Sequence, residues 1–324
     1  MAQPTNAFSV YDAKGTREDL ADYIGLVANM QTPFYARAAT TKATNTYHEW
    51  QTQALATPAD NKAAEGDIIT SYDSVTATVR LGNYTQISTK SFVITTSEQA
   101  VLKAGRADEV AYQAILKGRE LQKDIETTLV GTNKARAAGN DSAPTRQMAP
   151  VTSWIVTNVS KASDGTNPTG DGTDARTDGT ARALTETQLK DVMQSCWNNG
   201  GQPKLILCSA ANKRIISQFT GNNTRMINMG ETKTMSQSID YYETDFGMLE
   251  IIPDAHMRSA FRSSAVSELL VLDMEYWQRP VLVPITMREL AVTGLFEAPR
   301  LLFSEHSLAC LNEKASGIVA DLTA

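Results

Sequence analysis

Residues 95–131, TTSEQAVLKAGRADEVAYQAILKGRELQKDIETTLVG, decide the fold of this 324-residue chain. We predict a long helix here with a short helical lead-in, because Thr95 is followed three residues later by Glu98, as a capping box requires. Gly105 is expected to bend or interrupt the helix, and Gly131 to end it as a left-handed residue. Steps of three and four place one set of apolar and small residues on a single face: Val110, Ala114, Gly118, Leu121, Ile125 and Leu129.

The predicted helix is long for a globular protein. Residues 107–130 would measure about 36 Å at about 1.5 Å per residue. The segments on both sides of it favour β structure. A single long helix between two β regions is typical of a framework, so we interpret the chain as a structural protein.

The residues ahead of this helix predict an extended arm and a projecting β-hairpin. Residues 1–11 are polar, and residues 17–30 favour a short helix with too little apolar surface to fold alone. We interpret this arm as crossing neighbouring subunits, and the alternative is a frayed terminus. Three strands are predicted at 46–53, 74–81 and 84–94, with turns at 56–67 and at Gly82-Asn83. Because isolated hairpins are marginally stable in water, the hairpin requires a partner surface.

The chain after the helix predicts irregular structure and then an α/β region. Residues 151–159 favour a strand, and residues 160–182, rich in Asp, Gly and Thr, favour a surface loop over an ion site. The helix predicted at 185–198 has an apolar inner face formed by Leu189, Val192, Met193 and Cys196. The other predicted elements are a helix at 210–219, a polar loop at 221–238 and strands at 204–208, 240–244, 247–253, 268–273, 281–292, 299–310 and 317–322.

Composition and charge exclude several classes of protein. The formal net charge of −6 and the pI of about 5.2 argue against a nucleic-acid binder that works by neutralising phosphates. The N-terminus lacks the pattern of a signal peptide, and no stretch approaches the ~18 apolar residues of a membrane-spanning helix. We therefore expect a soluble protein made in a cytoplasm. Its widely spaced Cys196, Cys208 and Cys310 are expected to be reduced core residues.

The sequence contains no motif of catalysis or metal binding that we recognise. His48, His256 and His306 are far apart, and none lies in a paired metal-ligand spacing, so we interpret each as structural or surface-exposed. A nucleophile elbow and a phosphate-binding loop are both absent. We predict no catalytic residue, no cofactor and no metal.

Short strings in chain order carry a resemblance to a known family. They are GTREDL (15–20), TPF (32–34), HEWQT (48–52), NYTQIS (83–88), KAGR (103–106), KGREL (117–121), DIE (124–126), LD (272–273), YW (276–277), RP (279–280), ELA (289–291) and NEKA (312–315). Each string alone is weak evidence, whereas their order and spacing are specific and cover nearly the whole chain. In both respects the sequence resembles the major capsid proteins of tailed bacteriophages, which have the Hong Kong 97 fold.

The resemblance implies an α+β fold of the Hong Kong 97 capsid type. It assigns residues 1–45 to an N-terminal arm, 46–96 to an extended β-hairpin loop, 97–183 and 281–324 to a peripheral domain with a spine helix at 97–131, and 184–280 to an axial domain. Trp50, Arg119, Lys123 and Glu126 are then candidates for contact between subunits. For the charged outer face of the helix, simple solvation is an equally good interpretation.

The resemblance also implies a function, that of a major capsid protein whose copies assemble into the icosahedral head shell around a phage's double-stranded DNA. The implied partners are further copies in hexamers and pentamers, a portal protein, a separate scaffolding protein, a decoration protein and packaged DNA bound without sequence specificity, with no membrane. The implied location is the virion, after assembly in the host cytoplasm. An encapsulin-type shell around cargo enzymes and a cytosolic enzyme with an unrecognised site are the alternatives.

Overall fold

The computed structural model describes residues 28–66, 68, 72–103, 105, 108–219, 240–259, 262, 264–292, 294 and 297–324. The extended arm predicted at 1–11 and the polar loop predicted at 221–238 lie outside the described residues. So does most of the helix predicted at 17–30, and its last three residues, 28–30, are not helical.

The described residues contain five α-helices and thirteen strands. The helices are α1 (Pro33–Arg37), α2 (Thr96–Ala100), α3 (Glu109–Val130), α4 (Glu186–Asn198) and α5 (Ala210–Ile216). The strands are β1 (Ala39–Lys42), β2 (Tyr47–Thr52), β3 (Val79–Tyr84), β4 (Gln86–Phe92), β5 (Val159–Ser160), β6 (Leu205–Cys208), β7 (Tyr241–Thr244), β8 (Gly247–Pro253), β9 (Val266–Leu272), β10 (Trp277–Glu289), β11 (Arg300–His306), β12 (Ala309–Cys310) and β13 (Gly317–Thr323).

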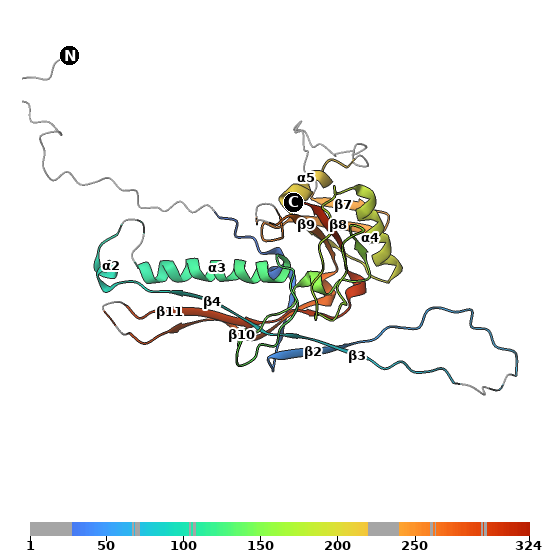
Figure 1. The fold of residues 1–324 in the computed structure, drawn as a ribbon, viewed down its shortest axis with the longest axis horizontal. Coiled ribbons are helices and arrows are strands. Elements are labelled where there is room, and N and C mark those ends of the chain that lie inside the picture. The colour runs from blue at the N-terminus through green and yellow to red at the C-terminus, as the bar shows by residue number, and fades with distance from the viewer. Residues whose placement is uncertain are drawn as a thin grey trace, which may run out of the picture.

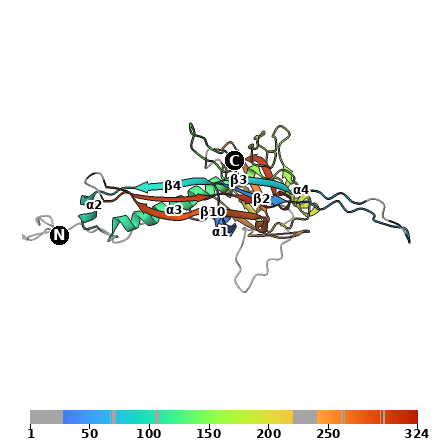
Figure 2. The same cartoon turned by 90° about the horizontal axis from the view of Figure 1, so that it is seen from below.

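The long helix α3 lies along a five-stranded sheet, and Figure 1 shows helix and sheet extending together to one side of the molecule. The strand order is β1-β10-β11-β4, with β12 also paired to β10. β10, β11 and β4 are antiparallel neighbours, whereas β1 runs parallel to β10. Seen from below in Figure 2, the same elements remain stacked along one long axis.

The α3 region forms as the sequence predicts, as a long helix with a separate helical lead-in. Thr95 caps α2 by accepting a hydrogen bond from the Glu98 N–H, and Asp108 caps α3 by accepting one from the Val110 N–H. The interruption between them includes Gly105, whose φ of +74° favours glycine. The prediction of a break at this residue is therefore confirmed.

The predicted apolar face of α3 is only half buried. Leu121, Ile125 and Leu129 are fully buried, whereas Val110, Ala114 and Gly118 are partly exposed. The C-terminal half of the helix lies where both sheets meet, and the N-terminal half lies only along the narrow sheet of β4 and β11 (Figure 1).

Gly131 ends α3 for a different reason from the one predicted. Its φ is −101°, so the prediction of a left-handed residue is wrong. A Cβ atom at this position would lie 2.0 Å from the carbonyl oxygen of His256. Glycine is needed here because another segment of backbone passes against the end of the helix.

A six-stranded sheet with the order β5-β13-β9-β6-β8-β7 forms the other half of the molecule. The sequence predicted its central strands as well as β7 and β8, which pair antiparallel in the structure. It also predicted α4, whose Thr185 and Gln188 form a capping box. The predicted inner face of α4 is confirmed, since Leu189, Val192, Met193 and Cys196 are all buried.

The last strand belongs to this six-stranded sheet. Residues 281–324 were expected to lie together in the peripheral domain, but β13 pairs with β9 and β5 instead of β10 or β11. Nearly every residue of β13 is buried, as is typical of a strand enclosed on both faces. Similarly, β1 is paired to β10, although residues 39–42 were assigned to the arm.

Three local predictions are wrong. Residues 151–159 form a 3-10 turn (Val151–Ser153), a loop and the start of β5, not a continuous strand. Gly82-Asn83 lies inside β3, not in a turn. The strand expected at 74–81 begins only at Val79, because residues 72–78 pair with no strand among the described residues.

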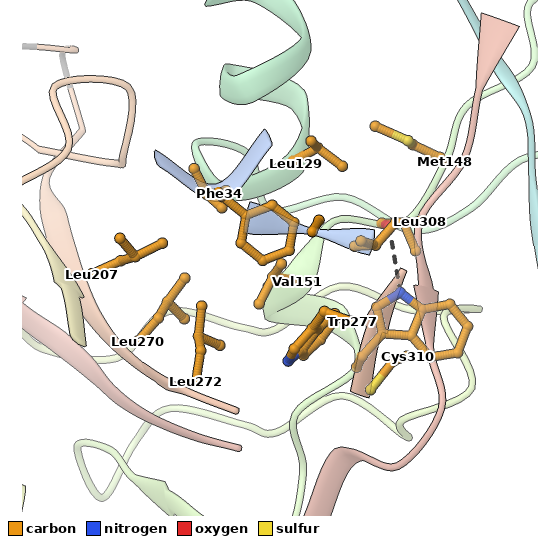
Figure 3. Packing of buried hydrophobic residues seen from close by; sticks show 14 of the residues in the cluster. Phe34, Leu129, Met148, Val151, Leu207, Leu270, Leu272, Trp277, Leu308 and Cys310 are labelled. Carbon is orange, nitrogen blue, oxygen red and sulfur yellow. Dashed lines mark hydrogen bonds between the residues drawn. The ribbon is translucent and has the colours of Figure 1, made fainter. Parts of the chain in front are cut away.

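The main core joins the two sheets. Figure 3 shows Phe34, Leu129, Val151 and Trp277 converging from segments far apart in the sequence. The rings of Phe34 and Trp277 meet edge-on with centroids 6.0 Å apart, and the Trp277 indole N–H donates to the Ser316 hydroxyl at 2.9 Å.

A charge placed in the buried half of α3 should unfold the subunit. We expect Leu121→Asp to lower the unfolding free energy by more than about 3 kcal/mol, because the new carboxylate has no partner in an apolar core. Thermal denaturation followed by circular dichroism measures this as a Tm lowered by about 10 °C or as the loss of a transition. The matched control is Ile115→Asp on the same helix, where the side chain is 58% exposed and the change should stay within about 0.5 kcal/mol.

Replacing either of two glycines of this region by alanine should change the stability of the protein, in opposite directions for the two positions. Gly118→Ala should stabilise the protein by about 0.5–1 kcal/mol, because alanine favours helix and its Cβ would only touch Leu302 at 3.8 Å. Gly131→Ala should destabilise it by several times as much, because the Cβ would collide with the His256 backbone. Equal Tm values for the two variants would contradict the close approach at the end of α3.

Candidate assembly surfaces

The hairpin of β2 and β3 is held firmly at its base by its own subunit. The side chain of Asn83 is fully buried. Its amide nitrogen donates to the carbonyl oxygens of Ala149 and Leu308 at 3.1 and 2.9 Å, and its oxygen accepts from the Ala149 N–H at 3.0 Å. Arg136 donates to the Tyr47 hydroxyl at 2.8 Å. These bonds fix the direction in which the hairpin leaves the body.

Trp50 is part of this base, and the expectation that it lies on a contact surface is wrong. It is only 8% exposed, and its ring centroid lies 5.2 Å from that of Trp154. The alternation of β2 directs this side chain towards the body, where the segment around Trp154 covers it.

The described residues of the distal part of the hairpin, residues 53–78, form side-chain hydrogen bonds and ion pairs only within the hairpin, such as the one from Gln53 to the Thr76 carbonyl oxygen. In Figures 1 and 2 it projects well beyond the six-stranded sheet. Leu55 is 97% exposed and Val75 is 93% exposed. Tyr72 and Ile68 are similarly exposed. A group of large apolar side chains on such a segment is typical of an interaction site.

A second group of exposed apolar side chains lies at the far end of the five-stranded sheet, around α2. It comprises Val93, Val101, Leu102, Leu290 and Val292. These residues follow β4, separate α2 from α3, and follow β10. Exposed apolar side chains therefore lie on the two segments that Figure 1 places at opposite ends of the molecule, the region around α2 and the distal hairpin.

The six-stranded sheet carries a smaller aromatic patch. Trp197 of α4 and Phe246 of the β7–β8 turn lie with ring centroids 5.8 Å apart, and both remain partly exposed. Beside them is a hollow of about 390 Å³ whose lining includes Glu186, Lys190 and Tyr242. Tyr242 donates to Glu186, so these polar groups already bond to one another.

The outer face of α3 is partly engaged within the subunit. Lys90 of β4 forms an ion pair with Asp124 at 2.7 Å, and the hydrogen bond to Asp124 raises the pKa of Lys90. Arg119 is exposed and Lys123 is partly exposed. Their proposed contact with another subunit remains a prediction.

Glu126 is not on that outer face, so this contact candidate is corrected. Its side chain is fully buried because α1 packs against α3. Its two oxygens accept hydrogen bonds from the backbone N–H groups of Phe34 and Tyr35 at 2.8 and 2.7 Å. Helical periodicity could not reveal this contact, since the partners are more than ninety residues apart in the sequence.

The predicted surface loop 160–182 packs more closely on the body than expected. Arg176 is buried and donates to the Ile155 carbonyl oxygen at 2.8 Å. Buried Asp321 of β13, at φ +57°, accepts from the N–H groups of Ala162 and Gly179. Many polar groups of this loop therefore bond to each other, to neighbouring loops and to Asp321 of β13.

Few side chains among the described residues are arranged as in a catalytic or metal-binding site. Among them, no group of three or more His, Cys, Asp and Glu residues is placed to hold a metal ion. Burial raises the pKa of the Cys196 and Cys208 thiols to about 12, which opposes formation of a reactive thiolate. Burial also lowers the pKa of His306 to about 4. In the part of the chain that the structure describes, no helix is both long and apolar enough to cross a bilayer.

Comparisons with known proteins point to one family. A model described as the SU10 major capsid protein matches residues 3–323. The major capsid protein of Escherichia phage Phieco32 is 31% identical over 130 residues, which cover 40% of this chain. The match spans only 37% of that relative's own length.

Solved structures share the fold at low sequence identity. The Cyanophage A-1(L) capsid matches with a TM-score of 0.63 and 12% identity, over 95% of this chain and 98% of the other. Gordonia phage Cozz matches with a TM-score of 0.62 and 10% identity, over 99% and 97%. The SrpI encapsulin of Synechococcus elongatus matches with a TM-score of 0.54 and 10% identity, over 96% and 93%. With its Hong Kong 97-type α+β fold and a family match over nearly its whole length, the chain belongs to the SU10 major capsid protein family.

Proposed function

We propose that this protein is the building block of an icosahedral phage head, in which hexamers and pentamers of the chain enclose double-stranded DNA. The observation that carries this proposal is the hairpin with a fixed base and an unpartnered apolar distal half. A segment held in one direction but lacking its own core is suited to pack on another copy. Family membership supports the same role.

The two exposed apolar groups suggest how copies interlock. The distal hairpin of one copy, with Leu55, Tyr72 and Val75, would lie on the α2 end of the next, where Leu102 and Val101 are exposed. Burial of each such side chain contributes about 1.5–3 kcal/mol. Because the two patches differ, the contact is head-to-tail, and a head-to-tail contact that closes produces rings such as capsomers.

We infer four regions in the assembled subunit. They are an N-terminal arm, an extended loop formed by the hairpin, a peripheral domain of α3 with the five-stranded sheet, and an axial domain of the six-stranded sheet. β13 is grouped with the axial domain because of its pairing with β9. Arg119 and Lys123 remain candidates for contact with a neighbouring hairpin.

Further partners follow from this role. A portal protein, a separate scaffolding protein and packaged DNA are expected, and one similar structure contains decoration proteins beside the major capsid protein of Phage G. The net charge of −6 suits a container, because a lining that bound many phosphates would hinder DNA packaging. We propose a non-catalytic role, assembly in the host cytoplasm and residence in the virion.

An encapsulin-type shell is the second candidate, since an encapsulin shares the fold. The family model and the curated relative favour the phage role. Particles purified from infected or co-expressing cells would separate the two, because a phage head contains nuclease-protected DNA and an encapsulin contains protein cargo.

Shortening the hairpin should abolish assembly without unfolding the subunit. The last pair of the β2–β3 ladder joins Thr52 and Val79, and Gln53 and Thr78 lie next to it on the side of the hairpin tip. Residues 54–77 can therefore be replaced by Asn-Gly, which favours a two-residue hairpin turn. We expect a soluble protein with a Tm within a few degrees of the wild type. Negative-stain electron microscopy should show no closed shells.

A triple variant tests the apolar contact itself. Leu55→Ser, Tyr72→Ser and Val75→Ser keep the length of the hairpin and should still raise the concentration needed for assembly at least tenfold. Normal shells from the shortened protein would overturn the proposed role of the hairpin. Normal shells from the triple variant alone would restrict its role to main-chain contacts.

A further inference from the structure

A buried carboxyl group fixes the point where the N-terminal segment joins the body. Glu126, in the C-terminal half of α3, accepts hydrogen bonds from the backbone N–H groups of Phe34 and Tyr35 with both of its oxygens. Phe34 at the same point is fully buried against Trp277. Glu126 and the buried Phe34 ring therefore together hold the chain where the N-terminal segment reaches the body.

A second buried carboxyl group lies beside the first. Asp254, which follows β8, is 2% exposed and contributes to the environment of Glu126. One of its oxygens accepts from the His256 N–H at 2.8 Å. A hydrogen bond between the two carboxyl groups contributes to a higher pKa of Glu126 and a lower pKa of Asp254, as expected when Glu126 carries the shared proton. Two buried carboxyl groups this close titrate as a pair.

The cations around this pair do not neutralise it. The charges of Lys123 and Arg262 lower the pKa of His256, and that of Arg262 also lowers the pKa of Asp254. Arg262 is exposed and donates to the Thr127 hydroxyl, and no ion pair joins either cation to Glu126 or Asp254 among the described residues. On α1, Arg37 is bonded to Glu250 of β8 at 3.0 Å. On β10, Arg279 stacks over the Tyr35 ring at 3.8 Å. His256 is the remaining titratable neighbour, and burial lowers its pKa.

Two ionised carboxylates in one buried pocket repel each other, so the pair retains a proton at neutral pH. Burial, and next the charge of Asp254, raise the pKa of Glu126 from 4.5 to about 8. Burial also raises the pKa of Asp254. The hydrogen bonds from the Tyr35 and Phe34 N–H groups lower the pKa of Glu126, but by less than burial and the charge of Asp254 raise it.

We propose that Glu126 and Asp254 form a proton-dependent clamp, which holds residues 33–38 on α3 while the pair keeps one proton and releases them when both groups are ionised. Release returns Glu126 to solvent and to its ordinary pKa. The closed state of the clamp therefore binds more protons than the open state between about pH 4.5 and 8. As a result, the equilibrium constant for opening increases by up to about tenfold per pH unit in that range. In a shell, opening would redirect the N-terminal arm, and this last step rests on the proposed function.

Hydrogen–deuterium exchange of the full-length chain tests the clamp. The measurement is the protection factor of a peptide that covers residues 33–38, corrected for intrinsic exchange, between pH 6 and pH 9. We expect protection in the wild type to fall at least tenfold across this range. A peptide covering residues 121–130 should change much less, because that part of α3 stays in the core.

Two isosteric variants separate the clamp from general instability. Asp254→Asn can still accept from the His256 N–H but carries no charge, so only burial still raises the pKa of Glu126. Protection at pH 9 should therefore be higher than in the wild type, and it should fall less steeply between pH 6 and pH 9. Glu126→Gln loses one of its two acceptors, so protection should be low and independent of pH. Glu120→Gln, on the solvent side of α3, should keep the wild-type profile.

A flat wild-type profile, or an Asp254→Asn profile with the wild-type slope, would overturn the proposal. Asp254→Asn alone carries the test if Glu126→Gln does not fold. The experiment needs no shell, so its failure is distinguishable from a failure of the proposed capsid role, which electron microscopy reports separately.

Discussion

The junction at the C-terminal half of α3 is the contact on which the rest of the structure depends. Leu121, Ile125 and Leu129 pack there in a core shared by both sheets. The His256 backbone passes against Gly131, and Glu126 holds the N-terminal segment. Because all of these groups meet within about three turns of one helix, the orientation of the two sheets and of the arm is decided at one place.

The two ends of the molecule, unlike this junction, carry exposed apolar side chains. The hairpin base is bonded to the body through Asn83, and this gives the distal segment a direction without a partner. The other end, around α2, exposes apolar side chains such as Leu102. A subunit with a buried core at its centre and exposed apolar side chains at both ends has surface left to bury against other copies.

The sequence predicted most of the helices and strands, but fewer of the contacts between them. Strong periodic segments such as α3 and α4 were found, and Thr95 was found as the cap of the lead-in helix α2, because capping residues and apolar steps are local properties. The predicted strand at 151–159 failed because its apolar residues are buried in irregular structure held by hydrogen bonds from distant segments. Trp50 and Glu126 were placed on the surface because neither local pattern shows which other segment covers them.

What the sequence by itself determined was the long helix, the α/β pattern, the family resemblance and the projecting hairpin. All of these depend on residues close together in the chain or on ordered strings. Only the tertiary structure decided that β13 enters the six-stranded sheet, that Gly131 is required by the backbone of His256, and that Glu126 lies beside Asp254. Each depends on contact between residues more than forty positions apart, and a buried charge or a backbone approach leaves no periodic trace in the sequence.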